Sequence, residues 1–349
     1  MPLEDTMKGK RVIFTLLVLL LSVGFNSKAQ QAGSNTYDFL NLTNSARVGA
    51  LGGNQVGMNL RDVSLVFHNP ANLSPSLHQS MTFNYVPYVA DIKMTYAGYA
   101  HSIEGMGTFG LSIHSINYGS FDRADVDGNL NGTFSAAEYA INLSYSKMLS
   151  PKLRAGISLK PIISNLEQYN SFGLAADLGL LYHSENQLFS AGITLKNVGS
   201  QITTYNDTYE PLPTDLQIGL SKKLAHAPFR FSLTAQDLFD WKMKYKVEDG
   251  NGDEISDAGN DGNSIDQLMR HMILGVELVP SDNFYVAVGY NHRRRQELGV
   301  SEKMSTTGFS WGFGFRVYKF HFAYGSARYH LAGSSNHFSI STNLSDFRK

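Results

Sequence analysis

The feature that most constrains the fold is a two-residue alternation of side chains that recurs along most of the chain after residue 80. In the stretch 172–183, FGLAADLGLLYH, large apolar residues occupy the even positions, while glycine, aspartate and other residues occupy the odd ones. The stretch 308–317 repeats this, with Phe309, Trp311, Phe313 and Phe315 alternating with glycine and serine. A period of two is the signature of a β-strand, because successive side chains point to opposite faces of a sheet.

About fourteen such segments can be counted, each of roughly nine to thirteen residues, which is the length of a tilted membrane-spanning strand. Soluble β-sandwiches also alternate, but their strands average nearer five or six residues, so a soluble all-β fold is the less favoured alternative. An even number of antiparallel strands suits a closed barrel. The expected strands begin near Met81, Lys93, Thr108, Ala136, Leu153, Phe172, Leu188, Asp215, Phe229, His271, Phe284, Thr306, Phe320 and Asn336.

The composition agrees with a barrel in lipid. The chain has 21 Phe, 18 Tyr and 32 Gly, no Cys, and only 17% charged residues. Without cysteine, stability must come from hydrogen bonding and burial, and in lipid an open sheet edge would leave backbone groups unpaired. A formal net charge of −1 gives no basic surplus for binding nucleic acid. The sequence therefore predicts an all-β fold, a transmembrane antiparallel β-barrel of about fourteen strands.

The first residues have the pattern of a secretory signal peptide. Lys8, Lys10 and Arg11 precede an apolar run over residues 12–23, and the small residue Ala29 marks the expected cleavage point. The apolar run is shorter than the ~20 residues that a membrane anchor needs. We therefore divide the chain into a signal peptide (1–29), a leader (30–79) and a barrel (80–349), and we expect export.

The connections between the expected strands alternate in length. One set is short: IEGM, MLSPK, SENQ, AHAP, PSD and VYK. The other set, apart from its first member VADI, is expected to be long: residues 119–134, 164–171, 198–213, 240–270, 292–304 and 328–335. Outer-membrane barrels have short periplasmic turns and longer extracellular loops. The pattern predicts an outer-membrane location with both termini in the periplasm.

A fourteen-stranded barrel is wider than the eight-stranded kind that side chains can fill, so its lumen needs a plug unless it is a channel. The leader 30–79 is the candidate for that plug. Within it, residues 46–51 suit a short helix ended by Gly52 and Gly53, and Asp62 or Ser64 suits the start of another turn. Asn69 before Pro70 suits a turn or a helix entry. Inward-facing glycines leave room for such a plug, and a wet or paired interior tolerates the inward charges Lys160, Asp177, Lys196, Glu277 and Arg316.

Several stretches resemble the PorV/PorQ family of outer-membrane proteins of the bacterial type IX secretion system, and most closely its PorQ branch. They are SARVGALGGNQV, DVSLVFHNPANLS, DLGLLY with AGITLKNVG, and above all PTDLQIGLSKKLAHAPFRFSLTAQDL. The resemblance covers essentially the whole mature chain. The first two stretches alone indicate only the broader superfamily with long-chain fatty-acid transporters. The signature residues are Ala46, Arg47, Gly52, Gly53, Asp62, Asn69, Pro70 and Ala71.

The resemblance implies a FadL-like barrel whose N-terminal segment folds into the lumen. It also implies a place in the attachment complex, where secreted cargo loses its sorting domain and is anchored to lipopolysaccharide. The implied partners are a PorZ-like surface protein held on the membrane, together with the sortase and PorV-like subunits.

Two surface features invite sharper readings. Arg293, Arg294 and Arg295 form a positive cluster expected at an extracellular strand end, either as a solvated rim or as a contact for lipopolysaccharide or a partner, since arginine suits phosphate groups. Acidic stretches at 125–132 and 248–266 have oxygen ligands at spacings reminiscent of a calcium loop, but neither has the terminal glutamate of an EF-hand. We read them as solvated loops and expect no metal site.

No catalytic motif stands out. The eleven His residues are scattered, with no H-E-x-x-H pattern, and there is no nucleophile elbow, P-loop or dinucleotide fingerprint. We expect neither an enzyme nor a cofactor. Two transport functions remain as alternatives to a scaffold: a FadL-like transporter of long-chain fatty acids or other hydrophobic molecules, and a general porin. The polar, glycine-rich inner face opposes the first, and the long leader opposes the second.

Overall fold

The computed structural model describes residues 35–88, 91–125, 127, 129–241, 246–248, 254–256, 264–298, 306–330 and 333–347. The expected signal peptide (1–29) and the first leader residues (30–34) lie outside these ranges. The signal peptide and its cleavage point therefore stay predictions. The described part of the chain contains no helix whose length and hydropathy would let it cross a bilayer.

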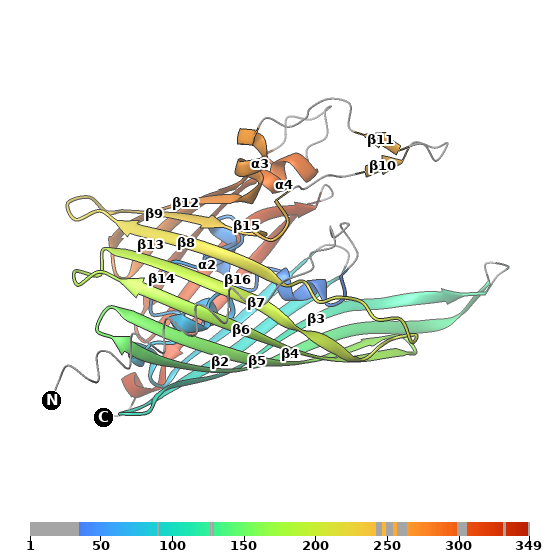
Figure 1. Cartoon of the computed structure of the whole chain (residues 1–349), viewed down its shortest axis with the longest axis horizontal. Helices are drawn as coiled ribbons and strands as arrows, with labels where there is room; N and C mark the ends of the chain where they lie inside the picture. The colour runs from blue at the N-terminus through green and yellow to red at the C-terminus, as the bar shows by residue number, and fades with distance from the viewer. Residues whose placement is uncertain are drawn as a thin grey trace. The chain divides into compact units, whose positions relative to one another are not determined.

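Fourteen strands close into one antiparallel barrel, in which neighbours in sequence are neighbours in space and β1 pairs with β16 (Figure 1). The two further strands, β10 (Lys246–Glu248) and β11 (Glu254–Ser256), form a separate pair. The barrel strands are β1 (Ser80–Pro87), β2 (Lys93–Ile103), β3 (Gly107–Ala124), β4 (Leu130–Ser150), β5 (Leu153–Leu166), β6 (Tyr169–His183), β7 (Phe189–Thr203), β8 (Asp215–Lys223), β9 (Phe229–Ala235), β12 (Met272–Ser281), β13 (Phe284–Asn291), β14 (Phe309–Val317), β15 (Phe320–His330) and β16 (Gly333–Asn343).

The alternation sorts side chains as predicted. In β6, Phe172, Leu174, Leu178 and Tyr182 are exposed on the outside, while the odd-numbered residues from 171 to 183 are buried. All fourteen strands carry large apolar side chains that are exposed on their outer face, such as Phe83 on β1 and Trp311 on β14. Such a band exposed to water would be unfavourable, because it is far larger than the apolar patches of soluble proteins. The outer surface is that of a barrel solvated by lipid.

Most strands start within three residues of the expected position, but β4 starts at Leu130 instead of Ala136, and several strands are longer than expected. β3 has 18 residues and β4 has 21, where nine to thirteen were expected. Three connections expected to be long, at 119–134, 164–171 and 328–335, are mostly strand, since β5 and β6 are joined by residues 167–168 alone. The reason is that a ladder of backbone hydrogen bonds continues whatever the side chains are, as in the pair Asn165–Asn170.

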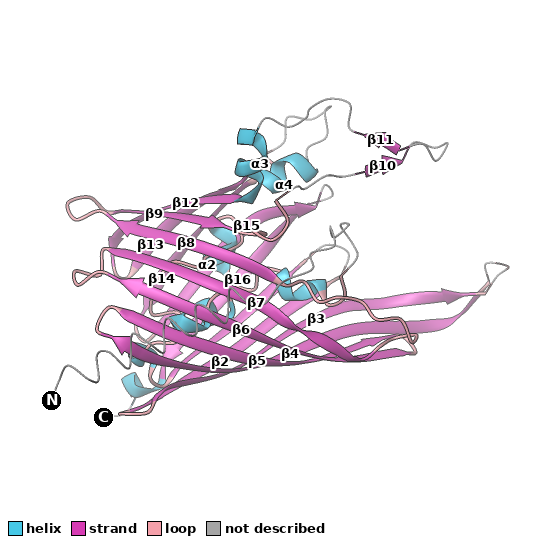
Figure 2. Cartoon of the chain, viewed as in Figure 1, coloured by secondary structure: helices cyan, strands magenta, loops and turns pink. Residues whose placement is uncertain are grey.

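The helices of the described residues fall into three groups (Figure 2). Two lie at the end of the barrel where the long connections are: α3 (Ser264–His271), before β12, and α4 (His292–Leu298), after β13. A short turn at the C-terminus, η5 (Leu344–Phe347), follows β16. The others precede β1 and are all short: η1 (Asp38–Asn41), α2 (Ala46–Ala50), η2 (Val63–Phe67), η3 (Pro70–Asn72) and η4 (Pro75–Leu77).

The residues before β1, 35–79, are called the inner segment, because they contact inward-facing residues of strands all around the barrel. Ala46 donates from its backbone N–H to Ser339 on β16, and Asn69 donates to the carbonyl of Leu180 on β6. Phe39 stacks on His114 of β3 with ring centres 5.6 Å apart. Side chains buried on this segment form the greater part of two hydrophobic clusters. The barrel therefore has a packed interior along the course of this segment.

The two ends of the described part of the chain lie toward different ends of the barrel, and because residues 1–34 lie outside it, the orientation of the N-terminus stays a prediction. Ser80 pairs with Asn343, so the start of β1 and the end of β16 lie at the same end of the barrel, with the short turns. However, the backbone N–H of Thr36 donates to Pro211, in the long connection between β7 and β8. The first described residues thus lie toward the opposite end from β1, because the inner segment runs through the lumen before the first strand begins.

Candidate functional site

The local structure of the inner segment follows the sequence pattern. The helix α2 ends at Gly52 and Gly53, whose φ angles of 100° and 105° are easily adopted only by glycine. The Asp62 side chain accepts a hydrogen bond from the backbone N–H of Ser64 at 2.8 Å and so begins η2. Asn69 does the same for Ala71 at 2.9 Å, with Pro70 as the first residue of η3. These are the three short helices expected from the caps.

Two rows of inward-facing glycines accept the backbone of this segment. The first glycine stripe, on β5 to β8, lies against residues 56–57 and 69–71. A Cβ built on Gly156 would stand 2.4 Å from the carbonyl carbon of Pro70, and one on Gly179 would stand 2.1 Å from Oδ1 of Asn69. No side chain fits at these positions, because the inner segment lies directly against the strand backbone. Glycine is therefore required there. The stripe consists of Gly156, Gly179, Gly192 and Gly219.

The second glycine stripe, on β12 to β15, lies under α2. Its cross-strand pairs bring Gly275 beside Gly289 and Gly312 beside Gly325. A Cβ on Gly325 would stand 2.2 Å from the carbonyl oxygen of Ala46. The signature residues Ala46, Gly52 and Pro70 therefore have a structural explanation, which is close contact between backbones. The stripe consists of Gly275, Gly289, Gly312 and Gly325.

Arg47 extends from α2 into an ion-pair network on the barrel wall. Its Nε donates to Oε1 of Glu277 on β12 at 2.7 Å, and Arg230 on β9 donates to Oε2 of the same carboxylate at 2.8 Å. The guanidinium also stacks on Tyr285, 4.0 Å from the ring centre. Glu277 is 1% exposed, so this network is almost dry. It couples the inner segment to two strands through charge that would be costly to leave unpaired.

A second buried ion pair joins β5 and β6. Nζ of Lys160 on β5 is 2.5 Å from Oδ2 of Asp177 on β6, and both side chains are 1% exposed. Asp177 also accepts from the backbone N–H of Asn197 at 2.8 Å. Lys160 and Lys196 both face the ring of Phe67, from the inner segment, at 5.3 and 4.9 Å. Lys160 and Asp177 thus compensate each other's charge, and the face of Phe67 lies beside both lysine ammonium groups.

The arginine cluster does not form one surface. Arg294 is 9% exposed and donates through Nη2 to the carbonyl of Gly52 at 2.9 Å. Arg293 pairs with Asp237 at 2.5 Å and with Glu297, whereas Arg295 is exposed. The prediction of a three-arginine surface contact is therefore corrected for Arg294, which faces inward because α4 turns that position toward the C-terminus of α2.

The helices α3 and α4 form a small platform at the end with the long connections. Asp266 of α3 accepts from Nε2 of His292 and from Nε of Arg270, both at 2.8 Å. Trp241 stacks on His271 at 4.8 Å, and the apolar side chains of Ile265 and Leu268 are 65% and 41% exposed. Most of the acidic stretch 248–266 lies outside the described residues. In the other one, Asp125 accepts from the backbone N–H groups of Asp127 and Asn129, as a turn would.

The platform should respond to acid. Hydrogen bonds from His292 and Arg270 hold the pKa of Asp266 below its ordinary value. A depressed pKa stabilises the folded state above the unfolded value of about 4 and loses that effect as pH falls through the lower, folded value. Below about pH 4, α3 should therefore loosen from α4. Fluorescence of Trp241, in a Trp311→Phe background, should change there, and Asp266→Asn should remove that step alone. An identical acid step in Asp266→Asn would refute the assignment.

Similarity to known proteins is found among solved structures. No protein-family model matches it, and the curated proteins give no significant match. Among solved structures, the Pseudomonas putida toluene transporter TodX is 13% identical with a TM-score of 0.49, over 86% of this chain and 96% of TodX. The CymD monoaromatic hydrocarbon channel is 13% identical (TM-score 0.47; 86% and 96%), and a Pseudomonas aeruginosa FadL homologue is 11% identical (0.45; 86% and 98%). At these values the likeness concerns the barrel fold alone.

Proposed function

We propose that this chain is a non-enzymatic outer-membrane anchor, whose lumen is filled by its own N-terminal segment and whose long-connection end holds a surface partner. The observation that carries the proposal is the fit of the inner segment onto two glycine stripes, locked by the ion pairs of Arg47, Glu277 and Arg230. A channel that conducts at rest gains nothing from such a seal. A membrane anchor gains rigidity from it.

The partner-binding end in this proposal is the one that carries α3, α4 and the described residues 236–241 that precede them. Exposed apolar side chains on α3, beside charged groups of α4, give the mixed surface typical of a protein contact. By the sequence resemblance, we propose that the partner is the PorZ-like surface protein of the type IX attachment complex, with the sortase and PorV-like subunits nearby. The chain would then act while cargo is released and attached to lipopolysaccharide.

The test is affinity purification of the tagged chain from its native outer membrane, with identification of the proteins that co-purify. We expect Ile265→Asp with Leu268→Asp to reduce recovery of the partner at least tenfold. Tyr318→Asp, which is 76% exposed in the turn at the other end, should leave recovery unchanged. Equal recovery in both variants, or normal cargo attachment after deletion of the chain, would rule the proposal out.

The main rival is transport of hydrophobic molecules, since TodX is a toluene transporter and CymD is a monoaromatic hydrocarbon channel. For this chain it would require the inner segment to leave its glycine stripes. Growth on long-chain fatty acids that collapses on deletion, with surface attachment intact, would favour this rival. A general porin instead requires conductance of the unmodified barrel in planar bilayers.

A further inference from the structure

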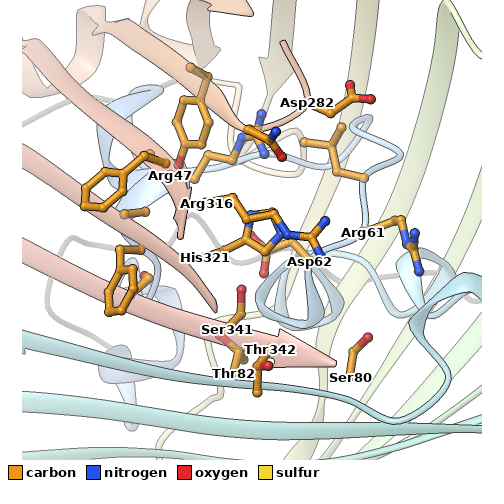
Figure 3. Close-up of a pocket in the computed structure, with 18 of the residues that line it drawn as sticks. Arg47, Arg61, Asp62, Ser80, Thr82, Asp282, Arg316, His321, Ser341 and Thr342 are labelled. Carbon is orange, nitrogen blue, oxygen red and sulfur yellow. The ribbon is translucent and has the colours of Figure 1, made fainter. Parts of the chain in front are cut away.

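A cavity of about 500 Å³ lies at the end of the barrel where β1 starts and β16 ends (Figure 3). Its walls come from β1, β12 to β16 and residues 59–63 of the inner segment. None of the roles proposed above uses it. It opens at the end opposite to α3 and α4, so a function here is independent of the surface partner.

The lining carries an excess of basic side chains. Five basic groups face three carboxylates of the lining, and with Glu277, which stands behind Arg47 and Arg230, one positive charge is left over. Asp62 caps η2, and Asp346 pairs with Arg316 at 3.2 Å. The third, Asp282, is exposed at a turn. The basic groups are Arg47, Arg61, Arg230, Arg316 and Lys319.

Two of these basic groups, Arg47 and Arg230, are mostly buried. Arg47 and Arg230 share the single carboxylate of Glu277, and their side chains are only 16% and 12% exposed. One carboxylate compensates one of the two guanidinium charges, so a positive charge remains at the wall of the cavity with little water to solvate it. Such a charge favours an anion in the adjoining space.

Hydroxyl groups complete the lining. Ser80 and Ser281 each accept a hydrogen bond, from Asn343 and from the backbone N–H of Asn283, so their own protons are available to a ligand. Arg61 donates to Ser76 through one nitrogen and has further N–H groups to offer. In Figure 3 the side chains of Arg61, Arg316 and Ser80 stand around the same space. Guanidinium and hydroxyl donors together suit a tetrahedral oxyanion.

We propose that this cavity binds a phosphate-type oxyanion, presented either as a free phosphate or as the headgroup of a lipid in the adjoining leaflet. Arg61 and Arg316 contact the anion from opposite sides, and the Arg47–Glu277–Arg230 network supplies the charge behind it. The neighbouring apolar residues Leu60 and Val279 accommodate the group that carries the phosphate.

Calorimetry on the full chain, folded in a non-ionic detergent without phosphate, tests the proposal. Inorganic phosphate at constant ionic strength should bind with a Kd of about 1 mM. Arg61→Gln with Arg316→Gln should weaken binding at least tenfold, whereas Arg123→Gln, an exposed and ion-paired arginine on β3, should not change it. Heat-modifiable migration on gels checks that each variant is folded.

Two further titrations identify the source of the phosphate group and test whether other anions bind. Short-chain phosphatidic acid that binds tenfold more tightly than phosphate assigns a lipid headgroup, and equal binding assigns free phosphate. The proposal is overturned if phosphate does not bind the unmodified chain, if acetate binds as well as phosphate, or if the double variant binds as the unmodified chain does.

Discussion

Replacing Gly289 with valine is expected to expel the inner segment from the barrel. A Cβ at this position would lie 2.2 Å from the backbone nitrogen of Gly52 and 2.3 Å from the carbonyl carbon of Leu51. Backbone atoms cannot rotate away as a side chain can. The substitution should therefore lower the free energy of unfolding by about 3 kcal/mol, the upper end of the range for overpacked cores. We expect a lower midpoint of urea unfolding, as measured by the change in migration on gels. We also expect measurable conductance in planar bilayers.

The matched control is Gly333→Val. A Cβ on Gly333 has nothing within 4 Å, and this glycine also lies in a barrel strand. Its midpoint and its conductance should match those of the unmodified chain. If both variants behave alike, the inner segment does not depend on the second glycine stripe, and the sealed lumen is no longer supported.

The second large effect is expected from Glu277→Gln. The substitution keeps the shape of the side chain but leaves Arg47 and Arg230 without the carboxylate that both contact. Removing one member of a buried ion pair typically costs about 3–5 kcal/mol, because the remaining charge is buried without a partner. We expect a corresponding fall in the urea midpoint and easier proteolysis of the inner segment, which Arg47 ties to the wall.

Glu167→Gln provides the comparison. Glu167 pairs with Arg123 at 2.6 Å, but the two side chains are 30% and 49% exposed. Exposed pairs contribute roughly 0–1 kcal/mol, since water solvates the charges when they separate. A fall in midpoint as large for Glu167→Gln as for Glu277→Gln would show that burial does not decide the strength of these pairs.

The sequence predicted local features well. Residue types indicated Asn69 before Pro70 as a turn or helix entry and Gly52 as the stop after a short helix, because a cap acts on the backbone two or three residues away. Asp62 and Ser64 were alternatives for the next turn, and the structure has Asp62 as its cap. The strand lengths were wrong where polar residues continue a hairpin beyond the lipid, as in residues 118–124 of β3, which pair only with β4. Side-chain alternation marks the part of a strand that has lipid on one face and the barrel interior on the other. It does not mark where backbone pairing stops.

The alternation by itself determined the fold class, the number of strands and the two faces of each strand, because a period of two is written locally along the chain. Only the tertiary structure decided which residues meet across the lumen. Arg47 and Glu277 are 230 positions apart, and no spacing predicts their contact. Closure of the barrel fixes the register of every strand, and register decides where the glycine stripes, the buried charges and the basic cavity form.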